Sequence, residues 1–182
     1  MNKMFKVIVA VMLLMFALAT AGCGGDKFAG TWFSVRPNMV SKFSGDYYEQ
    51  ITIEENSDNS YIIKKVSSSY KKKDKLLSGS FFLGTALYDL TFKWTPGKLE
   101  QQTATLKENK LIVDGTAGML VYAYVEKDGT LMCSDGLVYA KEQADSMKKF
   151  KETEQKRLTD LKDQDKMSFY KKKNIKGFAF SD

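Results

Sequence analysis

The segment MLVYAYVEKDGTLMCSDGLVYA, residues 119–140, decides the fold class of this chain. It contains three short runs rich in apolar and aromatic residues, separated by the dipeptides Asp128-Gly129 and Asp135-Gly136. Asp-Gly between two β-type runs is typical of the tight turn of an antiparallel hairpin, because both turn positions need a positive φ. The segment therefore predicts two consecutive hairpins.

Further β-type runs precede these hairpins at intervals of about ten to fifteen residues, the spacing of an antiparallel meander. They lie at 30–35, 47–54, 60–66, 80–94, 101–107 and 111–113. The lysine-rich stretch 70–75 is expected to form a bend. An open meander of about seven to nine strands would have two exposed edges, and closure removes them. We therefore expect a mainly β fold, an antiparallel meander closed into a small barrel, with a β-clam or β-sandwich as the alternative.

The first strand begins with the sequence FAGTW at 28–32. This Gly-x-Trp element resembles the one in lipocalins and smaller lipocalin-like (calycin-type) domains, and the resemblance extends over residues 28–141 by strand pattern. It implies an up-and-down barrel that Trp32 closes at one end and whose interior holds an apolar ligand. In that family a basic residue of the last strand often packs over the Trp, and Lys141 is the residue available for that role.

A barrel of about eight strands is just wide enough to be filled by side chains or to hold one small ligand. Aromatic residues in the predicted strands suit either outcome, and core packing is their commoner role. Tyrosines favour a ligand slightly, because a buried hydroxyl needs a polar partner. The candidate ligand-binding residues are Trp32, Tyr88, Trp94, Tyr122, Tyr124 and Tyr139.

The amino terminus has the layout of a cleaved signal peptide. Lys3 and Lys6 precede an apolar run at 7–18, which is shorter than the ~20 residues that a membrane-spanning helix needs. Small residues then lead to Cys23, a pattern that resembles the lipobox of bacterial lipoproteins. The resemblance implies a signal peptide at 1–22, attachment of diacylglycerol and palmitate to Cys23, and a short lipidated tether at 23–27.

Such an anchor implies a protein at the cell membrane or outer membrane, facing the extracytoplasmic side. Lipidation of Cys23 would leave Cys133 without a partner, since the chain has two cysteines. The exported domain is therefore expected to be held together by its own core. Nucleic acid is not an expected partner, because no recognition motif is visible.

Catalytic chemistry has few candidate residues. The chain has no histidine, which removes Ser-His and Cys-His nucleophiles and the usual nitrogen ligands of zinc. Cys133 lies beside a hairpin turn with no evident base, so a buried structural thiol is expected. The carboxylates considered for acid and base catalysis, none in a distinctive motif, are Asp46, Glu49, Glu54, Glu55 and Asp89. We expect no enzyme activity, no cofactor and no metal site.

From Ala140 the apolar residues recur at helical spacings, with charges between them. This pattern predicts an amphipathic helix of about 25 residues, followed by a basic, aromatic tail within 142–182. The helix can pack on its own domain, which is the commonest outcome, or pair with a partner. The tail can return to the domain or meet a partner, and its lysines suit an anionic lipid surface.

Two hypotheses for function rank ahead of an enzyme. The first is a lipid-anchored envelope protein that holds a small apolar ligand in its barrel. The alternative is a non-catalytic structural or interaction lipoprotein with a filled barrel, which docks onto an envelope protein complex through its C-terminal helix and tail. A filled interior would favour the alternative.

Overall fold

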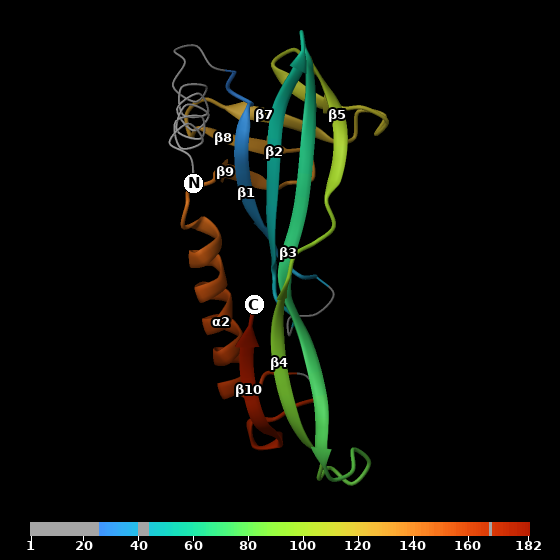
Figure 1. The fold of residues 1–182 in the computed structure, drawn as a ribbon, viewed down its shortest axis with the longest axis vertical. Helices are drawn as coiled ribbons and strands as arrows, with labels where there is room; N and C mark the ends of the chain where they lie inside the picture. The colour runs from blue at the N-terminus through green and yellow to red at the C-terminus, as the bar shows by residue number, and fades with distance from the viewer. Residues whose placement is uncertain (1–25, 40–43, 168) are drawn as a thin grey trace, which may run out of the picture.

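The computed structural model describes residues 26–39, 44–167 and 169–182. The expected signal peptide at 1–22 and Cys23 lie outside these residues. The described chain forms ten strands, one α-helix and a short 3-10 helix (Figure 1). The elements are β1 (Gly30–Arg36), β2 (Tyr47–Ser57), β3 (Ser60–Ser78), β4 (Leu87–Thr95), β5 (Glu100–Lys107), β6 (Lys110–Val113), β7 (Val121–Val125), β8 (Thr130–Cys133), β9 (Val138–Lys141), α2 (Ser146–Asp163), η1 (Lys172–Asn174) and β10 (Ile175–Ser181).

Eight of the strands form a closed antiparallel barrel. Hydrogen-bonded neighbours follow the order β3-β2-β1-β9-β8-β7-β6-β5, and β5 pairs with β3 to close the ring. The closing contact uses the first part of β3, from Ser60 to Lys65, opposite Thr105 to Glu100 of β5. The predicted fold class, mainly β with a closed barrel followed by a C-terminal helix, is confirmed.

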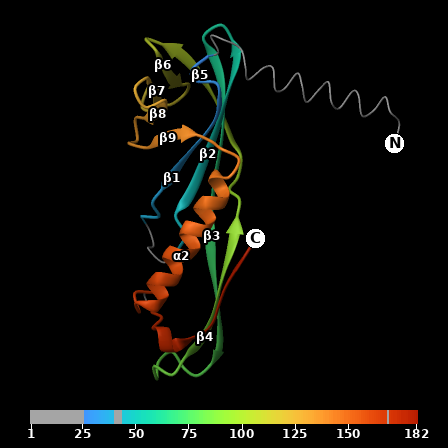
Figure 2. The ribbon, with the colours of Figure 1, turned by 90° about the vertical axis from the view of Figure 1, so that its left-hand side faces the viewer.

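A second region projects from the barrel, and we call it the wing. It consists of β3 from Ser69 to Ser78, together with β4, β10 and α2 (Figure 1). β3 has 19 residues, so it extends past the barrel and pairs with β4 along its second part. β10 adds to β4 in parallel, and α2 lies alongside this extended sheet (Figure 2). The C-terminal tail therefore returns to the domain as an edge strand.

The lysine-rich stretch 70–75 is part of β3, so the expectation of a bend there is wrong. Alternate side chains of a strand point to opposite faces. Tyr70 is buried in the wing, whereas Lys71, Lys73 and Lys75 are exposed on the other face. The stretch forms a strand because only one face of the wing sheet is covered, and the lysines occupy the face that meets water.

Each region has its own hydrophobic core. The barrel core contains Phe28, Trp32, Ile51, Ile53, Tyr61, Ile63, Ala104, Leu111, Val113, Tyr122, Leu131, Cys133 and Tyr139. The wing core contains Tyr48, Tyr70, Leu90, Phe92, Trp94, Phe150, Leu158, Met167 and Tyr170. β2 contributes to both, because Ile51 points into the barrel while Tyr48 points to the opposite face, toward α2.

The expected strand at 80–94 is shorter in the structure. Residues 79–86 form a loop at the end of the wing, and β4 takes up only the remainder. Gly79 has a φ of +84°, and a Cβ at this position would lie 2.2 Å from the carbonyl oxygen of Thr85. The chain therefore turns tightly at Gly79 and leaves the apolar residues 81–83 exposed.

The helix is also shorter than expected, because its predicted start at Ala140 belongs to the barrel. Ala140 and Lys141 lie in β9 and pair with Phe33 and Trp32 of β1. The helix begins at Ser146 and has 18 residues.

The apolar stripe of α2 packs against its own domain. Its buried positions recur every four residues, at Ser146, Phe150, Glu154 and Leu158. The charge of Glu154 within this stripe is satisfied, since the Asp46 backbone N–H donates to its Oε1 over 2.8 Å and Arg157 donates to its Oε2 over 2.9 Å. A buried carboxylate requires such partners. The apolar face of the helix is thus used within the molecule.

Candidate functional site

The Gly-x-Trp element closes one end of the barrel. Lys141 lies over the Trp32 ring, with Nζ 4.0 Å from the ring centroid, and donates a hydrogen bond to the Ala29 carbonyl over 2.5 Å. Gly30 makes room for this arrangement, because its φ is +125° and a Cβ would lie 2.5 Å from Lys141 Nζ. Trp32 Nε1 donates to the Phe28 carbonyl over 2.9 Å. The expectation that Lys141 covers Trp32 is confirmed.

Three of the six candidate ligand-binding residues are core residues of the barrel. The exposed fractions of Trp32, Tyr122 and Tyr139 are 0%, 1% and 0%. The Tyr122 and Tyr139 rings contact each other edge to face, with centroids 5.9 Å apart. Tyr124 is partly buried and contacts the rings of Trp32 and Phe28. A void of ligand size would leave its lining side chains accessible, so these side chains fill the barrel interior instead of lining a pocket.

The other two candidates, Tyr88 and Trp94, lie in the wing. Trp94 contacts Tyr70 and Phe150, whose ring centroids are 5.2 and 6.1 Å away. Tyr88 contacts Tyr170 edge to face, with centroids 4.8 Å apart. The structure therefore divides the six candidate residues between two separate cores.

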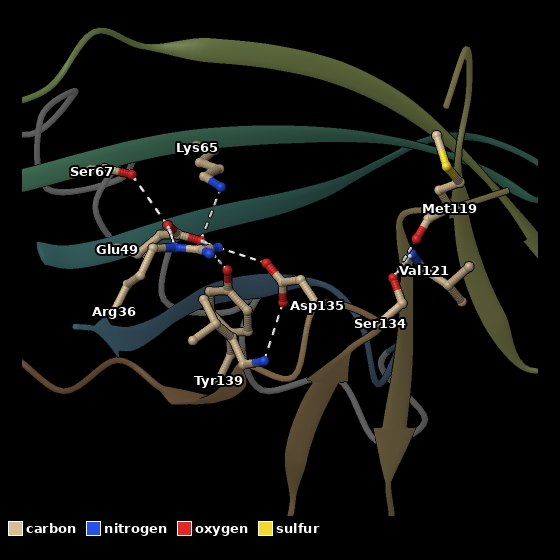
Figure 3. A network of polar contacts seen from close by, with 10 residues as sticks. Arg36, Glu49, Lys65, Ser67, Met119, Val121, Ser134, Asp135 and Tyr139 are labelled. Carbon is tan, nitrogen blue, oxygen red and sulfur yellow. Dashed lines mark hydrogen bonds and ion pairs between the residues drawn. The ribbon is translucent and has the colours of Figure 1, made fainter. Parts of the chain in front are cut away.

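A cluster of charged groups closes the barrel on the side of the wing, and Glu49 is at its centre (Figure 3). Glu49 is 1% exposed. Arg36 Nε lies 2.9 Å from its Oε2, Lys65 Nζ lies 3.0 Å from its Oε1, and the Tyr139 hydroxyl donates to the same Oε1. Asp135 joins the cluster through Arg36 Nη2, 2.6 Å away. The buried carboxylate of β2 thus has partners from three other strands, β1, β3 and β9.

The Glu49 cluster holds its carboxylates ionised. Burial alone would raise the pKa of Glu49, but the hydrogen bonds from Arg36, Tyr139 and Lys65 outweigh it and lower that pKa. Burial and the hydrogen bond to Glu49 raise the pKa of Tyr139. A general acid or base works best with a pKa near the operating pH, and these shifts move both groups away from neutrality. The cluster therefore has the properties of a structural ion network.

Sequence reasoning named Glu49 among the carboxylates but did not identify its partners. The alternation of β2 places Glu49 on the same face as Ile51 and Ile53, which is an inward-facing charge. A charge at such a position needs a buried cationic partner. Arg36 was the residue overlooked, and this inward position of Glu49 is the signal that would have led to it.

Cys133 is a buried free thiol, as expected from the sequence. Burial raises its pKa, which leaves less of the reactive thiolate at neutral pH. Among the described ranges, no group of three or more His, Cys, Asp or Glu residues is placed to hold a metal ion. No helix in the described part of the chain is long and apolar enough to cross a membrane.

An open hollow of about 550 Å³ lies on the outer wall of the barrel, over β6, β7 and β8. Ile112, Val121, Ala123 and Met132 line it. They alternate along their strands with core residues such as Leu111 and Tyr122, so the hollow faces solvent and not the barrel interior.

Comparison of the chain with models of protein families, with curated proteins and with solved structures found no match. The likeness to lipocalin-like domains therefore consists of the closed eight-stranded antiparallel barrel and the covered Trp32 at its end.

Proposed function

We propose that this protein is a non-catalytic interaction lipoprotein of the bacterial cell envelope. In this proposal the filled barrel is a rigid base next to the lipid anchor, and the wing meets another envelope component. The observation that carries it is the burial of Trp32, Tyr122 and Tyr139 inside the barrel, each at most 1% exposed.

The filled interior supports this function over the hypothesis of an apolar ligand in the barrel. Ligand pockets of proteins have volumes of roughly 300–1,000 Å³. Opening such a space here would require Trp32, Tyr122 or Tyr139 to leave a packed core, and Tyr139 would also lose its hydrogen bond to Glu49. Both changes are unfavourable, because close packing and the partners of a buried charge stabilise the fold.

The charged cluster supports a non-catalytic function. Hydrogen bonds and ion pairs surround the Glu49 carboxylate, and its lowered pKa makes it a poor proton acceptor. The buried Cys133 thiol has a raised pKa, and thus neither group is prepared for proton transfer or nucleophilic attack.

The proposed anchor fits the position of the barrel in the chain. Asp26, the first described residue, is three positions after Cys23 and four before β1. A lipid on Cys23 would therefore hold the Trp32 end of the barrel close to a bilayer. Each buried methylene of an acyl chain contributes about 0.8 kcal/mol, so a multiply acylated cysteine anchors a domain stably.

The wing is the proposed contact region, although the apolar stripe of α2 is not. That stripe is occupied by the wing core, so α2 stiffens the wing and presents its charged face outward. Exposed apolar side chains gather instead on the loop at the end of the wing.

Native mass spectrometry tests the filled barrel. The chain from Gly24 onward, purified gently from its own host, is expected to have the mass of the bare polypeptide before and after denaturing extraction. A small apolar molecule that travels with the folded protein and is lost on unfolding would contradict the proposal and support the ligand hypothesis.

Metabolic labelling with palmitate tests the anchor. The full chain is expected to take up label and to enter the detergent phase, and Cys23→Ala is expected to lose both properties. Cys133→Ala is the matched control, because it removes the other cysteine and should remain labelled. Equal labelling of Cys23→Ala and the wild type would rule out the proposed anchor.

A further inference from the structure

The end of the wing carries an unusual concentration of exposed apolar side chains. Among the described residues, twelve large hydrophobic side chains are exposed, and half of them lie here. These six, which we call the tip, are Leu76, Leu77, Phe81, Phe82, Leu83 and Phe169. Phe82 is 96% exposed and Leu83 is 77% exposed, so water surrounds them almost completely.

The tip is a formed structure assembled from two distant parts of the chain. Thr85 Oγ1 accepts a hydrogen bond from the Ser80 backbone N–H over 3.1 Å, which closes the base of the loop. The Phe81 ring contacts Phe82 and Phe169, with centroids 6.0 and 6.1 Å away. The aromatic residues of the tip are therefore held together at the end of the wing.

Lysines surround the tip. The stretches 71–90 and 163–176, which adjoin the tip, contain nine lysines and four aspartates and no glutamate. Two of the aspartates have partners within the fold: Asp74 accepts a hydrogen bond from the Tyr170 hydroxyl, and Asp165 accepts one from the Lys172 backbone N–H. These donors are neutral and leave both carboxylates charged, but nine lysines against four aspartates still give the two stretches a net charge of +5.

A small hollow lies among these groups. It has a volume of about 210 Å³, and its lining includes Phe81, Phe169, Lys171 and Lys173. Its lining thus combines two exposed phenylalanines with two lysines, residue types that suit a phosphate headgroup with an apolar portion beside it.

We infer that the tip binds the surface of an anionic lipid bilayer. A bilayer interface has apolar chains inside and charged phosphates outside, and the tip has the matching order of apolar residues at the end and lysines behind them. Lys73 and Lys75 are set back along β3 from its last paired residue, Ser78. Lys171 and Lys173, which line the hollow beside Phe81 and Phe169, place positive charge next to exposed apolar side chains, as an anionic bilayer surface requires.

This inference rests on the proposed function, because that function places the contact with another envelope component on the wing. The tip lies far from the Trp32 end of the barrel: Gly30 is level with Ile53 and Ile63, and β3 continues from Ile63 to Ser78 (Figure 1). At about 3.3 Å per residue, this part of β3 spans about 50 Å. A protein lipidated at Cys23 would therefore have two membrane contacts at opposite ends of a long molecule.

Liposome flotation tests the inference. The chain from Gly24 onward is suitable because it contains both cores in full and cannot carry the lipid anchor. It is expected to float with vesicles of phosphatidylcholine containing about one third phosphatidylglycerol, and far less with phosphatidylcholine alone. Added salt should weaken flotation, since it screens the lysines.

The decisive variant is Phe81→Ser with Phe82→Ser and Leu83→Ser. These side chains are exposed, so the urea midpoint of the variant should equal that of the wild type. Its affinity for the anionic vesicles should be at least about tenfold lower. The matched control is Met119→Ser with Met132→Ser and Val138→Ser, exposed apolar residues of the barrel, and it should bind as wild type does. Lys171→Glu and Lys173→Glu should each weaken binding about fivefold.

Wild-type flotation by the triple tip variant would overturn the inference. Absence of flotation with anionic vesicles would overturn it as well and would leave a protein as the partner of the tip. Neither result bears on Cys23, which the tested chain lacks. Conversely, a failure of palmitate labelling or an apolar ligand in the barrel would leave the flotation result unchanged.

Discussion

The barrel and the wing share β3, and β2 contributes to both cores, but the two regions are assembled differently. The barrel is built from neighbouring hairpins around a core that is closed at one end by Trp32 and Lys141 and at the other by Glu49 and its partners. The wing joins β3 and β4 to a helix and a strand that follow much later in the chain. The difference indicates that the barrel is the self-contained unit, and that the wing depends on it through β2 and β3.

The largest expected effect comes from removing one tryptophan from each core. Trp32→Ala should lower the free energy of unfolding by about 4 kcal/mol, because it leaves a cavity in a closed barrel. Trp94→Ala should cost about 3 kcal/mol in the more open wing. Since β2 and β3 belong to both regions, urea unfolding of each variant, followed by circular dichroism and by fluorescence, should give one shared transition. Two separate transitions would show that the wing unfolds independently.

The next effect concerns the charged end of the barrel. Glu49→Gln should lower the free energy of unfolding at neutral pH by about 3 kcal/mol, since it leaves Arg36 and Lys65 without their buried partner. Glu55→Gln on an exposed part of β2 is the control and should change it little.

Glu49→Gln should also change how the free energy of unfolding depends on pH. The folded-state pKa of Glu49 lies below its ordinary value of 4.5, so the carboxylate stabilises the fold above that pH. This stability is lost as the pH falls through the folded-state pKa. Glu49→Gln lacks the contribution at every pH, and its stability should therefore fall less than that of the wild type between neutral and acidic pH. An equal fall in both proteins would mean that other groups cause the acid sensitivity.

A smaller effect tests how firmly the tail belongs to the wing. Phe180 of β10 stacks on Phe92 and contacts Tyr70, with centroids 5.3 and 5.4 Å away. Phe180→Ala should lower the free energy of unfolding by about 2 kcal/mol, less than a core tryptophan because the side chain is only partly buried. Phe169→Ala, which removes an exposed ring, should have almost no effect. Equal stability of the two variants would indicate that β10 is not stably docked.

The smallest effect concerns the cover of Trp32. Lys141→Met retains an apolar stem but loses the cation over the ring and the hydrogen bond to Ala29. The expected loss is about 1 kcal/mol, the typical size of these contacts. Lys127→Met, an exposed lysine on the turn between β7 and β8, is the control. The melting temperatures of the two variants give the comparison. Equal melting temperatures would show that the contacts of Lys141 with Trp32 and Ala29 do not stabilise the fold.

The sequence predicted the parts of the fold that depend on local patterns. Asp-Gly turns indicated the last two hairpins, which the structure contains. Lys141 over Trp32 followed from the family resemblance. These features depend on neighbours in the chain or on a known motif.

The parts that the sequence did not predict depend on pairing between distant segments. In the lysine-rich stretch 70–75, Tyr70 is the one aromatic residue, so the sequence pattern does not reveal which face of this strand is buried. The partner strand β4 and the helix α2, which covers that face, follow later in the chain and meet it only in the folded protein. Likewise, β10 finds its place beside β4 more than 80 residues away in the chain. The candidate aromatics were identified as buried material, but alternation alone could not assign Tyr88 and Trp94 to a second core.

A crystal structure of the chain from Gly24 onward, purified gently from its own host, tests most directly whether side chains fill the barrel. The predicted result is a barrel interior occupied only by protein, with Tyr122 and Tyr139 in contact and Tyr139 bonded to Glu49. Elongated electron density inside the barrel, with these tyrosines displaced from each other, would contradict a filled barrel and identify the protein as a carrier of an apolar ligand.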